Sequence, residues 1–173
     1  FFTPERNSFP KDDLTKIGEH YIGTVYNEIK KWLKHRAKTG PVGVTFSAGI
    51  DSGSVFLLTY HALRELGESP SRLKAFTLSV DGSGEDLMQA RKFLEALGLE
   101  LFLEPVEVDF SALDWKEAIE IVEDYKPLDI QSATMSLTLL KAVRAKYPEW
   151  KYVLDGEGGD ENLKDYPIEE NPE

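Results

Sequence analysis

The hydrophobic positions of this chain change their spacing several times, and the change predicts an alternation of strands and helices. Short apolar runs bounded by glycine, proline or polar turns are typical of strands, whereas apolar residues three and four positions apart are typical of helices. Runs of the first kind lie at residues 42–46, 73–80, 99–108 and 151–155. Pro105 predicts that the third strand lies at a sheet edge or ends there, because proline has no N–H to donate.

Helical spacing fills the segments before and between these runs. The first helix lies within residues 11–38, and Asp12 or Asp13 is a candidate N-cap. Its last turns are rich in lysine and arginine, which suits the negative end of a helix dipole better than a ligand site. Further helices are predicted at residues 54–66, 85–98, 114–125 and 132–147.

Strands that alternate with helices predict an α/β fold with a mostly parallel sheet covered on both faces. The 173 residues suffice for one domain with a sizeable core, and no internal repeat or low-complexity linker divides them. Because the chain opens on Phe1 and ends in PIEENPE, we expect residues 1–173 to be a single domain, truncated at its C-terminal end. No apolar run is long enough for a bilayer, so no membrane partner is expected. The absence of cysteine suits a cytoplasmic protein, which is the location we expect.

Charge and cysteine content narrow the chemistry. The net charge of −11 argues against a general nucleic-acid binder, so no nucleic-acid partner is expected. An acidic protein that binds a polyphosphate needs local help, usually a divalent metal held by carboxylates. The absence of cysteine excludes disulfides, a thiolate nucleophile and a cysteine-based zinc site.

Polar, glycine-rich turns follow several of the predicted strands. SAGIDSG (47–53) follows the first strand, DGSGED (81–86) follows the second, and DGEGGDE (155–161) follows the last. Ligands of open parallel sheets bind beyond the carboxyl ends of the strands. The three turns therefore predict a ligand pocket built from distant parts of the sequence.

The first of these turns has the composition of a phosphate-binding loop. Gly49 and Gly53 let the backbone bend and approach an anion closely, while Ser47 and Ser52 supply hydroxyl donors. A helix beginning near Ser52 or Gly53 would point unpaired N–H groups at the phosphate. Asp51 would repel phosphate unless a cation lies between them, which makes it a candidate Mg²⁺ ligand. The structural alternative is that Asp51 or Ser52 only caps the helix.

Two common nucleotide motifs are absent from the sequence. A Walker A loop needs a lysine after its last glycine, and no lysine or arginine occurs between Lys38 and Arg64. A dinucleotide fingerprint needs G-x-G-x-x-G, and GEGGDE lacks the third glycine at the required place. The loop is therefore a different kind of phosphate-binding element.

The two outer turns resemble motifs of a known family. SAGIDS resembles the SGGxDS loop of the PP-loop ATP pyrophosphatases, and VLDGEGGDE resembles the SGEGxDE segment of their asparagine synthetase-like branch; the similarity covers roughly residues 1–166. It implies an adenine nucleotide α-hydrolase-like, Rossmann-like three-layer sandwich. It also implies an ATP-dependent ligase that uses Mg²⁺ and ATP to adenylate a substrate carboxylate, releasing pyrophosphate. Ammonia or an amine would then displace AMP to form an amide.

The resemblance implies roles for individual residues. Asp51 and Asp160 would hold Mg²⁺, and Asp51 would also count among the catalytic residues. Glu157 would lie near the acyl-adenylate, where a carboxylate can orient or deprotonate the incoming ammonium. The residues that bind the nucleotide would be Ser47, Ala48, Gly49, Asp51, Ser52, Leu78, Asp155 and Gly156.

The chain departs from the family pattern at several positions. Ala48 replaces a glycine, which is tolerated if its φ is negative, and Asp155 replaces a serine. Gln131 stands where an arginine is frequent, and residues 162–166 replace an FGGY segment. No glutaminase domain with an N-terminal cysteine precedes the loop, so a separate ammonia-donating glutaminase domain or subunit is an expected partner, besides the small-molecule carboxylate.

Two other functions remain open at this point. One is another PP-loop activity, lactam-forming or base-modifying. The other is a degenerate nucleotide-binding or interaction domain without catalysis. The retention of three carboxylates, Asp51, Glu157 and Asp160, argues against a degenerate site.

Overall fold

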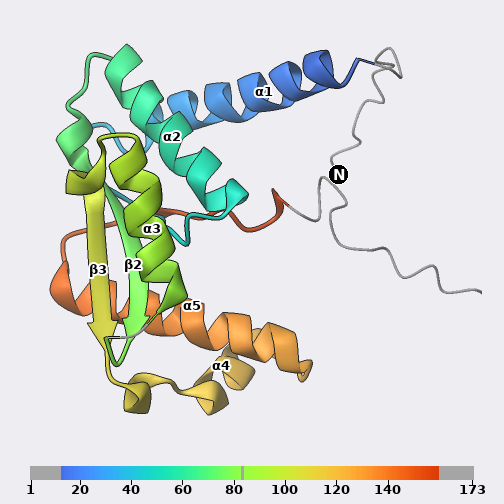
Figure 1. The fold of residues 1–173 in the computed structure, drawn as a ribbon, viewed down its shortest axis with the longest axis vertical. Coiled ribbons are helices and arrows are strands. Elements are labelled where there is room, and N and C mark those ends of the chain that lie inside the picture. The colour runs from blue at the N-terminus through green and yellow to red at the C-terminus, as the bar shows by residue number, and fades with distance from the viewer. Residues whose placement is uncertain (1–12, 83, 160–173) are drawn as a thin grey trace, which may run out of the picture.

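The structure is a computed structural model that describes residues 13–82 and 84–159. Helices and strands alternate along this part of the chain, as the sequence predicts (Figure 1). Short 3₁₀ turns occur in the connections, one of them at Glu100–Phe102. In chain order, the longer elements are α1 (Leu14–His35), β1 (Val42–Thr45), α2 (Ile50–Glu65), β2 (Leu73–Val80), α3 (Glu85–Ala96), β3 (Leu103–Val108), α4 (Trp115–Val122), α5 (Pro127–Lys146) and β4 (Tyr152–Leu154).

The strands of the described chain form a parallel sheet in the order β3-β2-β1-β4. The predicted α/β fold with a parallel sheet is therefore confirmed. The third strand is shorter than predicted, because residues 100–102 form a 3₁₀ turn before β3 begins. Pro105 lies in β3, at one end of the strand order of the described sheet, which is the edge position predicted for a strand that contains proline.

Two separate apolar cores show that the sheet is covered on both faces. Side chains alternate along a strand, so Leu73 and Ala75 of β2 point to one face and Phe76 points to the other. The first face packs against α1, α2 and α3 through residues such as Leu33, and the second packs against α5 through Leu139. This arrangement is the three-layer, Rossmann-like sandwich that the sequence predicts.

A glycine in the central strand makes room for an aromatic ring. A Cβ placed on Gly43 would lie 2.6 Å from the ring of Phe76, which is fully buried. Phe76 in turn packs against Tyr147 and Trp150, with ring centroids 5.6 and 5.4 Å away. The second core therefore depends on the absence of a side chain at position 43.

Helix α1 is anchored to the sheet by its C-terminal half. Asp13 is its N-cap, as predicted, and the Asp13 carboxylate accepts a hydrogen bond from the backbone N–H of Lys16 at 3.1 Å. Ile29 and Leu33 are buried, whereas Leu14, the first residue of the helix, is 80% exposed. Figure 1 shows the N-terminal half of α1 extending away from the sheet. In the part of the chain that the structure describes, no helix has the length and apolar character needed to cross a bilayer.

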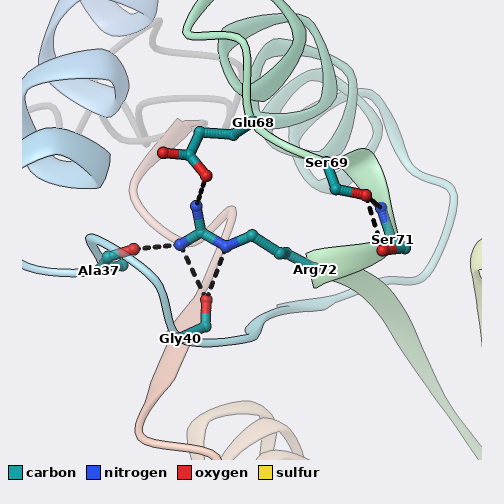
Figure 2. Close-up of polar contacts among 6 residues, drawn as sticks. All are labelled: Ala37, Gly40, Glu68, Ser69, Ser71 and Arg72. Atoms are coloured by element: carbon teal, nitrogen blue, oxygen red, sulfur yellow. Dashed lines mark hydrogen bonds and ion pairs between the residues drawn. The ribbon is translucent and has the colours of Figure 1, made fainter.

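The connection between α1 and β1 is held by Arg72, which precedes β2 (Figure 2). The Arg72 guanidinium donates hydrogen bonds to the carbonyl oxygen of Gly40 at 2.8 and 3.0 Å and also to that of Ala37. Glu68 pairs with the same guanidinium at 3.0 Å. A rigid, planar group thus fixes the turn that leads into the central strand.

Candidate functional site

The main cavity lies where the strand order of the sheet reverses. The chain runs from β1 to β2 and β3 on one side, and then crosses to β4 on the other side of β1. Because β1 and β4 are parallel neighbours, the loops that follow them lie side by side at the carboxyl edge of the sheet, where open α/β sheets bind their ligands. A cavity of about 340 Å³ lies at this point and is lined by both loops.

The loop after β1 leads directly into α2. The helix begins at Ile50, earlier than the predicted start near Ser52 or Gly53, and Gly49 is its N-cap. Among the described residues, no side chain caps this end, so the alternative that Asp51 or Ser52 only caps the helix is wrong. The first N–H groups of a helix have no partner within it, and here they lie beside the cavity. The positive end of α2 is therefore available to an anion.

The hydroxyl groups of the loop are held in place by one another. Ser47 and Ser52 lie with their Oγ atoms 3.2 Å apart, and the Ser52 Oγ also accepts from the backbone N–H of Ser47 at 3.3 Å. The Ser47 Oγ accepts a further bond from the N–H of Gly49 at 3.3 Å. Both hydroxyls line the cavity. They are thus ordered before any ligand arrives.

Ala48 has a conformation that the sequence analysis did not anticipate. Its φ is +62°, in the left-handed region, so the condition that a negative φ makes alanine acceptable is not met. The sharp turn from β1 into α2 imposes this conformation, which costs an L-residue roughly 1–2 kcal/mol. Gln89 of α3 donates a hydrogen bond to the Ala48 carbonyl at 3.3 Å and supports the strained residue. Ala48 itself is buried and is not among the cavity-lining residues.

The turn after β4 packs against the first turn of α2. A Cβ on Gly156 would lie 2.8 Å from the backbone nitrogen of Ser52, and a Cβ on Gly159 would lie 2.1 Å from the Asp51 carboxylate. Only glycine allows the two segments to come this close. Asp155 accepts a hydrogen bond from the backbone N–H of Glu157 at 3.1 Å, which shapes the same turn. The structure therefore brings the two predicted motifs into direct contact.

The charge of the cavity comes entirely from acidic side chains in the described lining. Asp51, Asp155 and Glu157 come from the two motifs, and Asp86 comes from the first turn of α3. No lysine, arginine or histidine of the described chain lines the cavity. Asp86 was not among the predicted site residues, although it belongs to the turn of residues 81–86 that was predicted to meet the other two turns.

Most of the remaining lining is apolar or weakly polar and comes from the end of β1, from β2 and from α5. Leu78, predicted to face the nucleotide, lines the cavity, and so does Thr77, whose hydroxyl donates to the Phe46 carbonyl at 2.6 Å. Met135 and Ser136 of α5 close the site from the opposite layer. Nothing in the spacing of α5 indicated this role, because it depends on how α5 packs across the sheet.

One position noted in the sequence lies outside the described cavity lining, and others fall outside the described residues. Gln131 is not among the residues that line it. Asp160, the second predicted Mg²⁺ ligand, lies outside the described residues, as do residues 162–166. The roles of Asp51, Glu157 and the nucleotide-binding residues stay predictions, although the structure gathers Ser47, Gly49, Asp51, Ser52, Leu78, Asp155, Gly156 and Glu157 around one cavity.

The residues present fit Mg·ATP. Phosphate groups need donors, which the uncapped helix end and the serine hydroxyls provide. The cavity lining supplies carboxylates and no cation, so a divalent ion is needed to balance a triphosphate. Within the described residues, no group of three acidic or histidine side chains could enclose a metal. Mg²⁺ is commonly held by one or two carboxylates together with substrate phosphates, and Asp51 at the cavity is a candidate for one of them.

Comparison with known proteins gives the family. The chain is 34% identical over 135 residues to Amidase chry2 of Gibberella zeae, a match that covers 73% of this chain. The same match spans only 20% of the length of that protein. A family model described as asparagine synthase matches residues 29–173, which include the two motif turns at residues 47–53 and 155–161. With both motifs joined at the reversal point of a parallel sheet, this match shows that the chain belongs to the asparagine synthase family.

Proposed function

We propose that this chain binds Mg·ATP and adenylates a substrate carboxylate in preparation for amide formation. The observation that carries the proposal is the contact between Gly156 and Ser52, which joins the two motif turns around an uncapped helix end. The family supplies the general expectation of an ATP-using synthetase. The relative from Gibberella zeae is called an amidase, so its name also refers to amide chemistry.

Binding of the triphosphate follows from the loop geometry. The N–H groups at the start of α2 and the hydroxyls of Ser47 and Ser52 would hold the β- and γ-phosphates. Asp51, beside Gly159, would bind Mg²⁺, which neutralises phosphate charge when it is present. The apolar lining around Leu78 would receive the adenosine.

The chemical step is an attack by the substrate carboxylate on the α-phosphorus. The bond between the α-phosphorus and the bridging oxygen breaks, and pyrophosphate leaves with the electron pair. The negative charge that develops on pyrophosphate lies toward the N–H groups at the start of α2, which stabilises the transition state. In the second step, an amine attacks the acyl carbon and AMP leaves. Glu157, an exposed carboxylate at the cavity, would accept the proton that the amine loses.

Two measurements test the proposal. Calorimetric titration of Mg·ATP should show binding that requires Mg²⁺ and that weakens at least about tenfold in Asp51→Asn. Asp109→Asn, which removes an exposed carboxylate outside the cavity, is the matched control and should bind normally. Carboxylate-dependent exchange of labelled pyrophosphate into ATP should then report adenylation. Mg·ATP binding that is unchanged by Asp51→Asn would contradict the proposed loop.

A nucleotide-binding domain without catalysis is the second candidate function. The left-handed conformation of Ala48 favours this function, because alanine is strained at this turn. Glycine would position the first N–H groups of α2 without that strain. The two candidates differ in the exchange assay. Tight, Asp51-dependent binding of Mg·ATP without pyrophosphate exchange for a panel of amino acids and other carboxylic acids would favour the non-catalytic function. Exchange with any of them would exclude it.

A further inference from the structure

A second cavity lies at the opposite end of the same two strands. It has a volume of about 290 Å³ and adjoins Gly40 and Pro41, which precede β1, and Lys151 and Tyr152, which begin the β4 segment. Because β1 and β4 run parallel, this cavity is at the amino-terminal edge of the sheet, away from the nucleotide cavity. The two cavities share no lining residue.

The charge of this second cavity is opposite to that of the first. Arg36, Lys38 and Lys151 line it, against the single carboxylate of Glu149. The chain as a whole has a net charge of −11, so the local excess of cations at this cavity is opposite in sign to the overall charge. Small anions are repelled by most of such a surface and are attracted where cations gather.

Among the described residues, these cations are not held in ion pairs. Two other basic residues at the end of α1 are paired, Lys30 with Glu65 at 2.5 Å and Lys31 with Glu28 at 2.6 Å. Within the described part of the chain, Arg36, Lys38 and Lys151 make no ion pair. The sequence suggested that all basic residues here only suit the helix dipole. The structure adds Lys151, which directly precedes β4 and is distant in the sequence, and the helix dipole does not explain its position.

Hydrogen bonds and packing hold the turn of residues 37–40, which borders this cavity. The Arg72 guanidinium donates hydrogen bonds to the carbonyl oxygens of Ala37 and Gly40, as Figure 2 shows. The ring of Tyr152 packs on Gly40, with its carbon atoms 3.6 and 3.7 Å from the position of a Cβ there. The turn that carries Lys38 is therefore fixed before a ligand binds, which lowers the entropy cost of binding.

We propose that this cavity is a second anion site, for a free phosphate or pyrophosphate ion, separate from the nucleotide site. Arginine presents a planar fork that matches the oxygens of a phosphate group, and lysine adds a point charge. Three cations against one carboxylate suit a multiply charged anion better than a monoanion. Because the cationic side chains are exposed, binding weakens as the salt concentration rises.

The test is titration of the chain with inorganic phosphate and with pyrophosphate, in EDTA and without nucleotide, followed by backbone amide NMR. The amides of Lys38, Gly40 and Lys151 should shift, and acetate at equal concentration should shift them much less. Lys38→Ala/Lys151→Ala should weaken binding at least about fivefold. Lys31→Ala/Lys92→Ala removes the same charge at exposed positions outside the cavity and should change binding less than about twofold.

Asp51→Asn changes the proposed nucleotide site and should leave phosphate binding at the second cavity intact. This variant therefore distinguishes the two sites. Absence of shifts at residues 38–40 and 151 would overturn the proposal. Equal weakening in the two double variants would also overturn it, because the effect would then be one of net charge. Shifts confined to residues 47–52 would assign the phosphate to the nucleotide cavity and reject the second site.

Discussion

The backbone of Gly156 lies directly against the backbone of Ser52. A Cβ at position 156 would be 2.8 Å from the Ser52 nitrogen and 3.1 Å from its Cα. The turn after β4 and the first turn of α2 therefore meet main chain to main chain, with no side chain between them. This contact, between segments far apart in the sequence, determines the shape of the cavity and motivates the first prediction.

Gly156→Ala should separate the two turns and weaken Mg·ATP binding at least about tenfold, because a methyl group cannot fit against backbone atoms at this distance. Calorimetry measures the affinity, and circular dichroism verifies that the variant is folded. Gly23→Ala is the matched control, since a Cβ there meets nothing within 4 Å. Unchanged affinity in Gly156→Ala would show that the turns are farther apart than described.

Ala48→Gly should stabilise the protein by about 0.5–1 kcal/mol, because glycine adopts a φ of +62° without the strain that alanine suffers. Urea unfolding measures the free energy of unfolding. Ala145→Gly, at an exposed position within α5, should have the opposite effect and destabilise by about 1 kcal/mol. A loss of stability in Ala48→Gly would contradict the left-handed conformation.

Gly43→Ala should destabilise the fold by about 1–3 kcal/mol, because the new methyl group would lie 2.6 Å from the Phe76 ring. Tyr147 and Trp150 hold that ring in place and limit its movement. Urea unfolding of Gly43→Ala, Phe76→Leu and the double variant gives the coupling energy. The smaller leucine of Phe76→Leu should recover part of the stability that Gly43→Ala loses. If the free-energy changes of the two single variants simply add in the double variant, residues 43 and 76 are not in contact.

Glu104 should make the stability depend on pH in the acid range. Burial opposes its ionisation, but hydrogen bonds from Lys146, Lys74 and Tyr147 outweigh burial and lower the pKa of Glu104 from 4.5 to about 2. Because the pKa is lower in the folded state, this stabilisation is complete above about pH 4.5 and is lost as the pH falls toward 2. Its size is on the order of 2 kcal/mol.

Unfolding free energies of the wild type and Glu104→Gln, measured between pH 2 and about 6, test this prediction. The difference between the two proteins should shrink as the pH falls. Glu28→Gln, which removes an exposed partner of Lys31, should keep the pH dependence of the wild type. A constant difference between wild type and Glu104→Gln would contradict a lowered pKa.

The sequence predicted the architecture because its signals are local. Strand runs such as 73–80 and the N-cap at Asp13 depend on neighbouring residues, and the structure confirms both. The edge position of the strand containing Pro105 follows from a missing donor, which is a property of that residue alone. The loop of residues 47–52 was recognisable for the same reason, since its glycines, serines and Asp51 are contiguous.

The site needed contacts that no local pattern contains. The left-handed conformation of Ala48 is set by the turn between β1 and α2, and alanine gives no sign of it in the sequence. Asp86 and Ser136 reach the cavity from α3 and α5 only because those helices pack on opposite faces of the sheet.

By itself, the sequence determined the order of strands and helices and the residues of the phosphate loop, because hydrophobic periodicity and turn chemistry act over a few positions. The tertiary structure alone decided that Gly156 would touch Ser52 and that Lys151 would join Arg36 and Lys38. Both outcomes depend on β4 pairing beside β1 after the chain has crossed the sheet. The packing of the whole core fixes the strand order. That packing joins residues far apart in the sequence, so it leaves no periodic signal in the chain.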